Sequence, residues 1–126
     1  MSKTISSFTL IRIYSTLKRG THTKIEKEIL PNAEIYVYVV ENHIVGFIGL
    51  DQNYIEGIFI DAHSQSKGIG TLLLNKVKED RNTLTLSVYK KNVNAIKFYK
   101  NNNFIITSES IDKDTNEIEY IMTWVK

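Results

Sequence analysis

The pattern of hydrophobic and polar residues predicts helices at the start of the chain and strands after them. Apolar residues recur at helical spacing between positions 8 and 17, and a second amphipathic stretch over residues 24–30 ends at Pro31. Both segments are expected to be helices. Three β-branched and aromatic runs follow, separated by short polar turns, at residues 35–40, 44–50 and 54–61. Such runs predict an antiparallel meander of three strands.

Helices and strands alternate in the second half of the chain. Helices are expected over residues 68–79 and 92–101, where apolar side chains gather on one helix face. Strands are expected at residues 83–88, 104–111 and 117–124, and the turn 112–116 joins the last two. This order predicts an α+β fold with a mixed sheet and helices on both faces. The length suits one domain over residues 1–126.

Composition and charge narrow the range of partners. The chain has 16 basic and 14 acidic residues, a net charge of +2, and its basic residues are scattered. A small anionic ligand therefore suits it better than a nucleic acid, which is not expected. The chain has no cysteine, and its three histidines lack ligand spacing, so neither a thiolate nucleophile nor a metal site is expected. No apolar run approaches the roughly 20 residues of a membrane span. The first residues also lack the apolar block of a signal peptide. A cytoplasmic protein without a membrane partner is therefore expected.

A glycine-containing loop carries the clearest chemical signal. The strand that includes Ile60 leads into a loop, and the loop opens the next helix through Gly68 and Gly70. The first N–H groups of a helix have no partner inside it and lie at the positive end of the helix dipole, so they can bind phosphate. Lys67 and the Thr71 hydroxyl can add charge and a hydrogen bond. A turn with a tight helix–strand contact explains the same glycines, and both interpretations stay open at this point.

Two motifs resemble those of the GNAT superfamily of N-acetyltransferases. Residues 65–70 (QSKGIG) resemble the signature Q/R-x-x-G-x-G/A, and residues 92–104 resemble the pattern N-x-x-A-x-x-x-Y-x-x-x-G-F, with Asn103 in place of the glycine. With the matching order of elements, the resemblance covers residues 34–124. It implies a mixed, mostly antiparallel sheet of six or seven strands, whose first edge strand would be missing or very short in this chain.

The resemblance also implies acetyl-CoA as the cosubstrate. In the family the pantetheine arm runs beside the strand equivalent to residues 58–60, in a splay between this strand and the next, and the pyrophosphate lies on the glycine loop. The residues expected to bind acetyl-CoA are therefore Ile58, Phe59, Ile60, Gln65, Ser66, Lys67, Gly68, Ile69, Gly70, Thr71, Asn92 and Ala95. Asn92 also suits a helix N-cap, and the two roles are compatible.

Tyr99 is the candidate for proton donation. It shares one helix face with Asn92 and Ala95, and it resembles the tyrosine with which the family protonates the leaving thiolate. A tyrosine that only packs in the core is the alternative.

The resemblance implies direct acetyl transfer from acetyl-CoA to the primary amine of a small molecule or peptide. Two other interpretations stay open: a non-catalytic acyl-CoA-binding or regulatory module, and a nucleotide- or phosphate-binding protein. The oligomeric state also stays open, and a homodimer is considered.

Glu56 and His22 are weaker candidates. Strand alternation places Glu56 on the side of Tyr54, Ile58 and Ile60, where it is either a general base acting through water or a solvated or ion-paired residue. His22 lies between the two helices predicted first, where the family builds substrate walls. It is therefore a candidate substrate contact, and surface exposure is its alternative.

Overall fold

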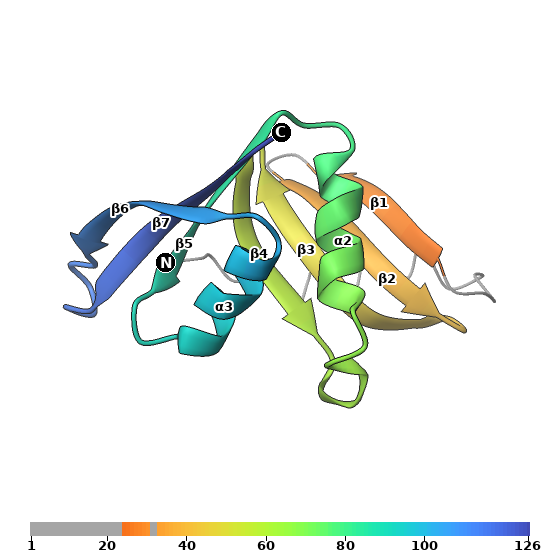
Figure 1. The fold of residues 1–126 in the computed structure, drawn as a ribbon. Helices are drawn as coiled ribbons and strands as arrows, with labels where there is room; N and C mark the ends of the chain where they lie inside the picture. The colour runs from red at the N-terminus through yellow and green to blue at the C-terminus, as the bar shows by residue number, and fades with distance from the viewer. Residues whose placement is uncertain (1–23, 31–32) are drawn as a thin grey trace.

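The computed structural model describes residues 24–30 and 33–126. In chain order the elements are β1 (Lys24–Leu30), β2 (Ala33–Val40), β3 (His43–Asp51), β4 (Tyr54–Ile60), the short 3-10 helix η1 (Ala62–Ser64), α2 (Ile69–Lys78), β5 (Thr83–Tyr89), α3 (Val93–Asn101), β6 (Ile105–Ile111) and β7 (Ile118–Val125) (Figure 1). Within these residues, no helix combines the length and the apolar character needed to cross a membrane.

The seven strands among the described residues form one sheet in the order β1-β2-β3-β4-β5-β7-β6. All neighbouring strands are antiparallel except β4 and β5, which are parallel, so the sheet consists of two antiparallel halves that meet at these two strands. The register of β4 with β5 contains one pair, Tyr54 with Thr85. Figure 1 shows β4 and β5 diverging toward their carboxyl ends. This is the splay expected from the resemblance, and the mixed, mostly antiparallel sheet is confirmed.

The segment before Pro31 corrects the sequence prediction. Residues 24–30, predicted to be a helix, form the edge strand β1, which pairs with β2 along its whole length. Ile25 and Ile29 are four residues apart, a spacing that places side chains on one side of a helix and also on one side of a strand. The local pattern is therefore ambiguous, and pairing with β2 decides it. The helix predicted over residues 8–17 lies outside the described residues.

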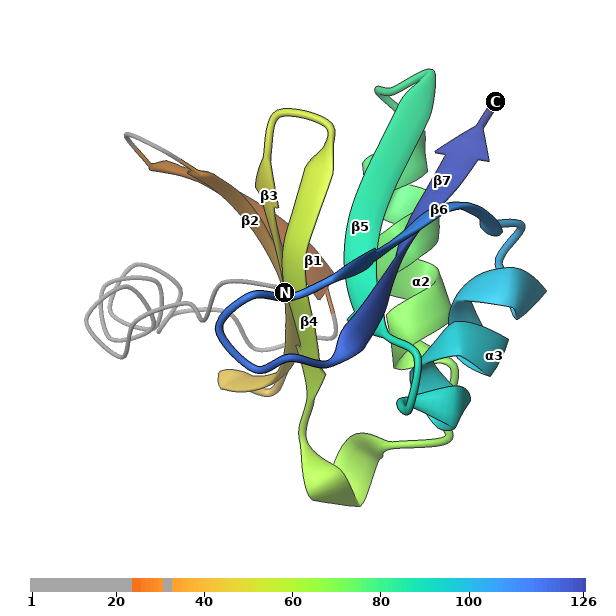
Figure 2. The same cartoon turned by 90° about the vertical axis from the view of Figure 1, so that its left-hand side faces the viewer.

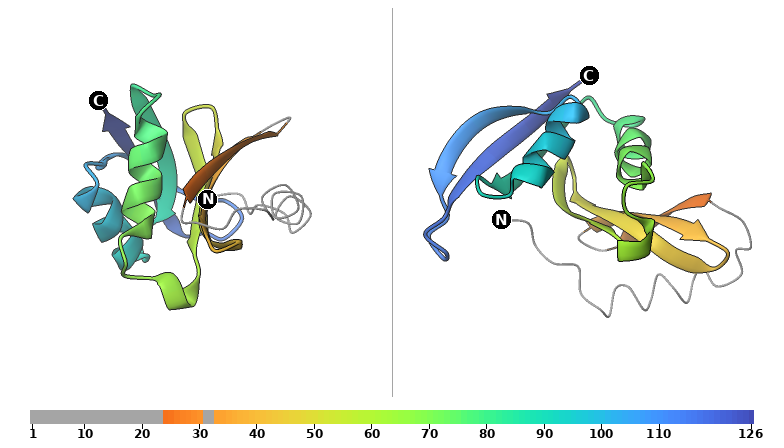
Figure 3. Two further views of the ribbon diagram at one scale, coloured as in Figure 1. Left: turned by 90° about the vertical axis from the view of Figure 1, so that its right-hand side faces the viewer. Right: turned by 60° about the horizontal axis from the view of Figure 1, so that its bottom comes forward.

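The main core lies between one face of the sheet and both described helices. Figures 2 and 3 show α2 and α3 on the same side of the sheet. The fully buried residues of this core include Tyr36, Ile48, Leu50, Ile55, Leu73, Leu74, Leu84, Leu86, Phe104 and Met122. A smaller cluster of Ile35, Val37, Val39 and Phe47 lies on the opposite face of β2 and β3, because successive residues of a strand point to opposite faces.

Candidate active site

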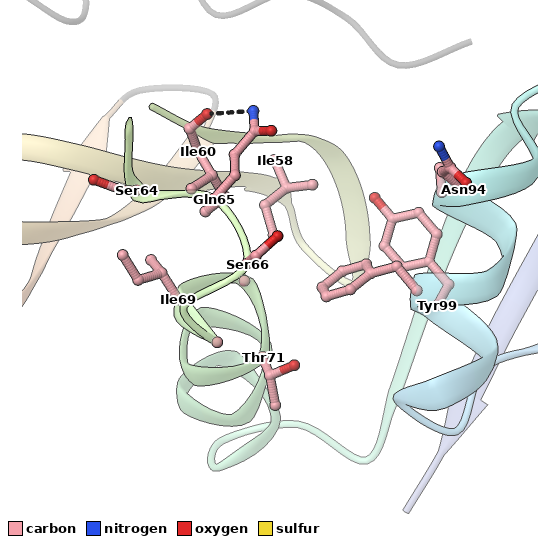
Figure 4. A pocket seen from close by; sticks show the side chains of 13 residues that line it. Ile58, Ile60, Ser64, Gln65, Ser66, Ile69, Thr71, Asn94 and Tyr99 are labelled. Carbon is pink, nitrogen blue, oxygen red and sulfur yellow. Dashed lines mark hydrogen bonds between the residues drawn. The ribbon is translucent and has the colours of Figure 1, made fainter. Parts of the chain in front are cut away.

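A cavity of about 620 Å³ lies at the carboxyl end of β4, beside the following loop, the start of α2 and one face of α3. It is lined by Ile58, Ile60, Ser64, Gln65, Ser66, Gly68, Ile69, Gly70, Thr71, Asn94, Ala95, Phe98 and Tyr99. Figure 4 shows side chains of the loop and of α3 facing one another across it. The fold therefore brings together every residue predicted to bind acetyl-CoA except Phe59, Lys67 and Asn92.

The start of α2, which follows the loop after β4, lies beside this cavity with backbone N–H groups that have no partner within the helix. Ser66 and Gly68 adopt left-handed conformations, with φ angles of 65° and 79°, which turn the chain into the helix. The Leu72 N–H donates to the Gly68 carbonyl oxygen at 3.0 Å and closes the first helical turn. The N–H groups of residues 69–71 thus lie at the positive end of the helix dipole, and all three residues line the cavity. This arrangement suits a phosphate group.

The two loop glycines are required for different reasons. A Cβ at Gly68 would meet no atom within 4 Å, so the requirement there is the left-handed backbone. A Cβ at Gly70 would lie 2.8 Å from Cζ of Phe98, so the missing side chain lets α3 pack against the first turn of α2. The alternative to phosphate binding was a tight helix–strand contact, whereas the tight contact at Gly70 joins two helices. Gly70 also lines the cavity, so the contact does not exclude a phosphate.

Tyr99 combines a packed ring with an available hydroxyl. The residue is 8% exposed, and its ring packs edge-on against Phe104 with centroids 5.7 Å apart. In Figure 4 its hydroxyl points from α3 toward the space beside Ile58. Burial raises the pKa of Tyr99 to about 12, because a phenolate would be poorly solvated there. Tyr99 therefore keeps its proton at neutral pH and can donate a hydrogen bond into the cavity.

A second cavity, of about 290 Å³, adjoins the first. It is lined by Gly57 and Ile58 of β4, Ser87, Val88 and Tyr89 of β5, and Asn92, Ala95 and Tyr99 at α3. Ile58, Ala95 and Tyr99 line both cavities, so the two meet at these side chains. Asn92 belongs to the second cavity, and its Oδ1 accepts a hydrogen bond from the Ala95 N–H at 3.3 Å, which confirms the N-cap role.

Strand β4 carries a β-bulge at Glu56, since consecutive residues of β3 face Ile55 and Gly57. The bulge adds one residue and breaks the alternation. As a result, Ile55 and Ile58 both pack in the main core although they are three positions apart on the strand. That Glu56 lies on the same side of the strand as Ile58 stays a prediction, because the bulge removes the alternation from which it was made. Glu56 is half-buried and directly precedes Gly57 of the second cavity.

Four other predicted residues have separate outcomes. The Phe59 side chain lies on the opposite face of β4, where it stacks on Phe47 with centroids 5.5 Å apart, so it does not line the cavity. Lys67 is exposed on the loop. The Gln65 amide nitrogen donates to the Ile60 carbonyl oxygen at 3.2 Å and ties the loop to the end of β4. His22 lies outside the described residues.

Sequence reasoning missed three residues that line the first cavity, Ser64, Asn94 and Phe98, and four that line the second, Gly57, Ser87, Val88 and Tyr89. Asn94 and Phe98 are four residues apart on α3 and so share one helix face. That spacing was visible in the sequence, but it did not indicate which face of α3 turns toward the loop. Ser64 lies in η1, whose position depends on the end of β4.

Comparisons with known proteins agree with this geometry. Residues 14–120 match the family described as acetyltransferase (GNAT) domain. The chain is 29% identical over 96 residues to the peptidyl-lysine N-acetyltransferase YiaC of Escherichia coli K12, covering 75% of this chain and 66% of that protein. It is 30% identical over 97 residues to the peptidyl-lysine N-acetyltransferase YjaB of Salmonella typhimurium, covering 76% and 67%. The chain thus spans about two thirds of the length of these relatives.

A solved structure shares the fold. The GNAT family acetyltransferase of Elizabethkingia anophelis with acetyl-CoA bound has a TM-score of 0.72 and 16% identity, over 85% of this chain and 100% of that chain. The family match covers most of this chain, including the glycine loop and α3. The chain therefore belongs to the GNAT family of acetyltransferases.

Proposed function

We propose that this protein transfers the acetyl group of acetyl-CoA to a primary amine by direct attack, within a complex that holds both substrates. One observation carries the proposal: two cavities meet at Tyr99. The first reaches the N–H groups at the start of α2, and the second lies between β4 and β5. A thioester held where they meet is open to an amine in the second cavity, and this proximity supplies much of the rate.

The first cavity is proposed to hold acetyl-CoA. Its N–H groups at residues 69–71 bind the pyrophosphate, and the exposed Lys67 adds positive charge beside it. Ile58, Ile60 and Phe98 form an apolar wall for the pantetheine arm. The acetyl-CoA bound to the Elizabethkingia anophelis protein, which shares this fold, supports the choice of ligand.

In the proposed transfer, the amine nitrogen bonds to the acetyl carbon and the carbon–sulfur bond breaks. The Tyr99 hydroxyl donates a hydrogen bond to the sulfur as negative charge develops there, and then gives up its proton. A phenol with a pKa of about 12 holds its proton more tightly than a thiol with an ordinary pKa of about 8.5. The hydrogen bond in the transition state is therefore the larger contribution.

Two protons leave the acceptor in this scheme. The ammonium group loses the first before attack, and this proton passes to Glu56 through water. The attacking nitrogen loses the second as the amide forms, and this proton returns Tyr99 to its neutral state. The products are the acetylated amine and the coenzyme A thiol, with one proton released.

The acceptor is proposed to be the side-chain amine of a peptidyl lysine. YiaC and YjaB are both peptidyl-lysine N-acetyltransferases, which supports this class. The second cavity supports it independently, because its lining within the described residues contains no Asp, Glu, Lys or Arg. Such a cavity suits a methylene chain and a neutral attacking amine, because an ion would lose its hydration there.

The test is coenzyme A release from acetyl-CoA with lysine-containing peptides and, for comparison, small amines. Release should require the amine, and mass spectrometry should find the acetyl group on the lysine. Release without amine, with a stable acetyl group on the protein, would contradict direct attack. Acetyl-CoA binding without transfer to any amine would favour a non-catalytic binding module instead.

A further inference from the structure

Little backbone pairing joins the two halves of the sheet in the described part of the chain. Every antiparallel pair of strands has six or seven register pairs, whereas β4 and β5 share one, Tyr54 with Thr85. Beside it, the Thr85 N–H donates to the Asn53 carbonyl oxygen at 2.9 Å. Because β4 and β5 are also walls of the second cavity, whatever sets their separation sets the width of that cavity.

A side-chain hydrogen bond crosses between the strands beyond that register pair. The Tyr54 hydroxyl donates to Oγ of Ser87 at 3.0 Å, in a part-buried position. Ser87 is two residues after Thr85 on β5, so the bond lies where backbone pairing has ended. The long, rigid ring of tyrosine suits a separation too wide for backbone hydrogen bonds. Ser87 itself lines the second cavity together with Tyr99.

We propose that the Tyr54–Ser87 hydrogen bond is a strut that sets the spacing of β4 and β5, and that both are positioning residues of the acetyl transfer. The second part rests on the proposed function. Ile58 on β4 borders both cavities, and Ser87, Val88 and Tyr89 supply the β5 wall of the second one. A 1 Å misplacement of reacting groups can cost on the order of 10²-fold in rate, so one bond at this point has a large effect on turnover.

A double-mutant cycle tests the positioning role. Tyr54→Phe and Ser87→Ala each remove the bond and keep most of the packing. Each should lower kcat for a lysine-containing peptide about tenfold and leave the acetyl-CoA dissociation constant, measured by calorimetry, within about twofold. The double variant should be no slower than either single variant, because the bond can be lost only once. Ser87→Thr, which keeps the hydroxyl, should be faster than Ser87→Ala.

Matched controls remove the same groups elsewhere in the sheet. Tyr38→Phe on β2 and Ser108→Ala on β6 lie outside both cavities and should leave kcat unchanged. A second readout does not depend on turnover. The amide proton of Thr85, which makes the backbone bond between β4 and β5, should exchange with solvent about tenfold faster in Tyr54→Phe and Ser87→Ala than in these controls.

The two readouts separate the strut from the function. If the wild-type protein acetylates no amine, the proposed function fails and the exchange rate of Thr85 alone decides whether the strut exists. Unchanged exchange refutes the strut. Faster exchange of the Thr85 amide with an unchanged kcat refutes the positioning role. Losses of kcat that multiply in the double variant also refute it.

Discussion

The ring of Phe98 fills the space that a side chain at Gly70 would need, with its Cζ 2.8 Å from the position of a Cβ there. This contact joins the first turn of α2 to α3. The phosphate end of the proposed site lies on α2, and Tyr99 follows Phe98 directly on α3, with the two ring centroids 5.3 Å apart. A change at Gly70 therefore affects both ends of the site through one contact.

Gly70→Val should abolish the thermal stabilisation of the protein by acetyl-CoA. In the wild type, a ligand at 100 times its Kd adds about 2.7 kcal/mol to the free energy of unfolding, because it binds the native state. The smaller change Gly70→Ala should reduce this effect by displacing Phe98. Adding Phe98→Leu to Gly70→Ala should restore the stabilisation by acetyl-CoA if displacement of the Phe98 ring causes the loss. It should not restore the stabilisation if the new methyl group at position 70 blocks the pyrophosphate itself. A normal thermal shift in folded Gly70→Val would refute the site.

Gly68→Ala should destabilise the fold without disturbing its packing. The residue has a φ of 79° and open space around its Cβ position, so the cost is that of a left-handed alanine, about 1–2 kcal/mol. Gly68→Asn should cost less, because asparagine tolerates this conformation. Urea unfolding measures both values. Equal stability of wild type and Gly68→Ala would show that the loop does not hold this conformation in solution.

Tyr99→Phe should lower turnover about 10²–10⁴-fold, because it removes the hydroxyl that stabilises the leaving sulfur. The aromatic packing against Phe104 remains, so the acetyl-CoA dissociation constant and the stability at neutral pH should change little. Steady-state kinetics and calorimetry on one variant measure both quantities. Normal turnover would leave Tyr99 a core residue only.

The burial of Tyr99 also predicts a loss of stability at high pH. Its pKa of about 12 in the folded state lies above the ordinary value of about 10, so folding favours the protonated form. This contribution is fully present below pH 10 and is lost as the pH rises toward 12. Relative to Tyr99→Phe, the wild type should lose about 1.4 kcal/mol by pH 11. Denaturant unfolding at pH 9 and 11 measures the free energy of unfolding of both proteins. Equal losses of stability in the wild type and in Tyr99→Phe would contradict the raised pKa.

Glu56→Gln tests the general base. If Glu56 takes the ammonium proton through water, the variant should lose most turnover at neutral pH, and the loss should shrink as the pH rises and the amine deprotonates unaided. Glu109→Gln on the exposed strand β6 removes an equivalent charge away from the site and should have a normal pH profile. If turnover of Glu56→Gln depends on pH as in the wild type, water or another group takes the ammonium proton.

After Pro31, local sequence patterns predict the type of each described α-helix and strand. Alternation and helical spacing predicted β2 to β7 and both described helices, because each pattern depends on residues close in sequence. The same reasoning failed for β1 and did not indicate the bulge at Glu56. The spacing of Ile25 and Ile29 suits two structures, and the bulge at Glu56 depends on the register with β3.

The sequence by itself determined the family and the loop that suits a phosphate, because the two motifs consist of neighbouring residues whose chemistry is readable in order. Only the tertiary structure decided which helix face turns to that loop, that two cavities meet at Tyr99, and that Tyr54 reaches Ser87, 33 residues away. These features depend on distances between elements far apart in the chain. Such distances arise from packing and strand pairing, which a local pattern of polar and apolar residues does not encode.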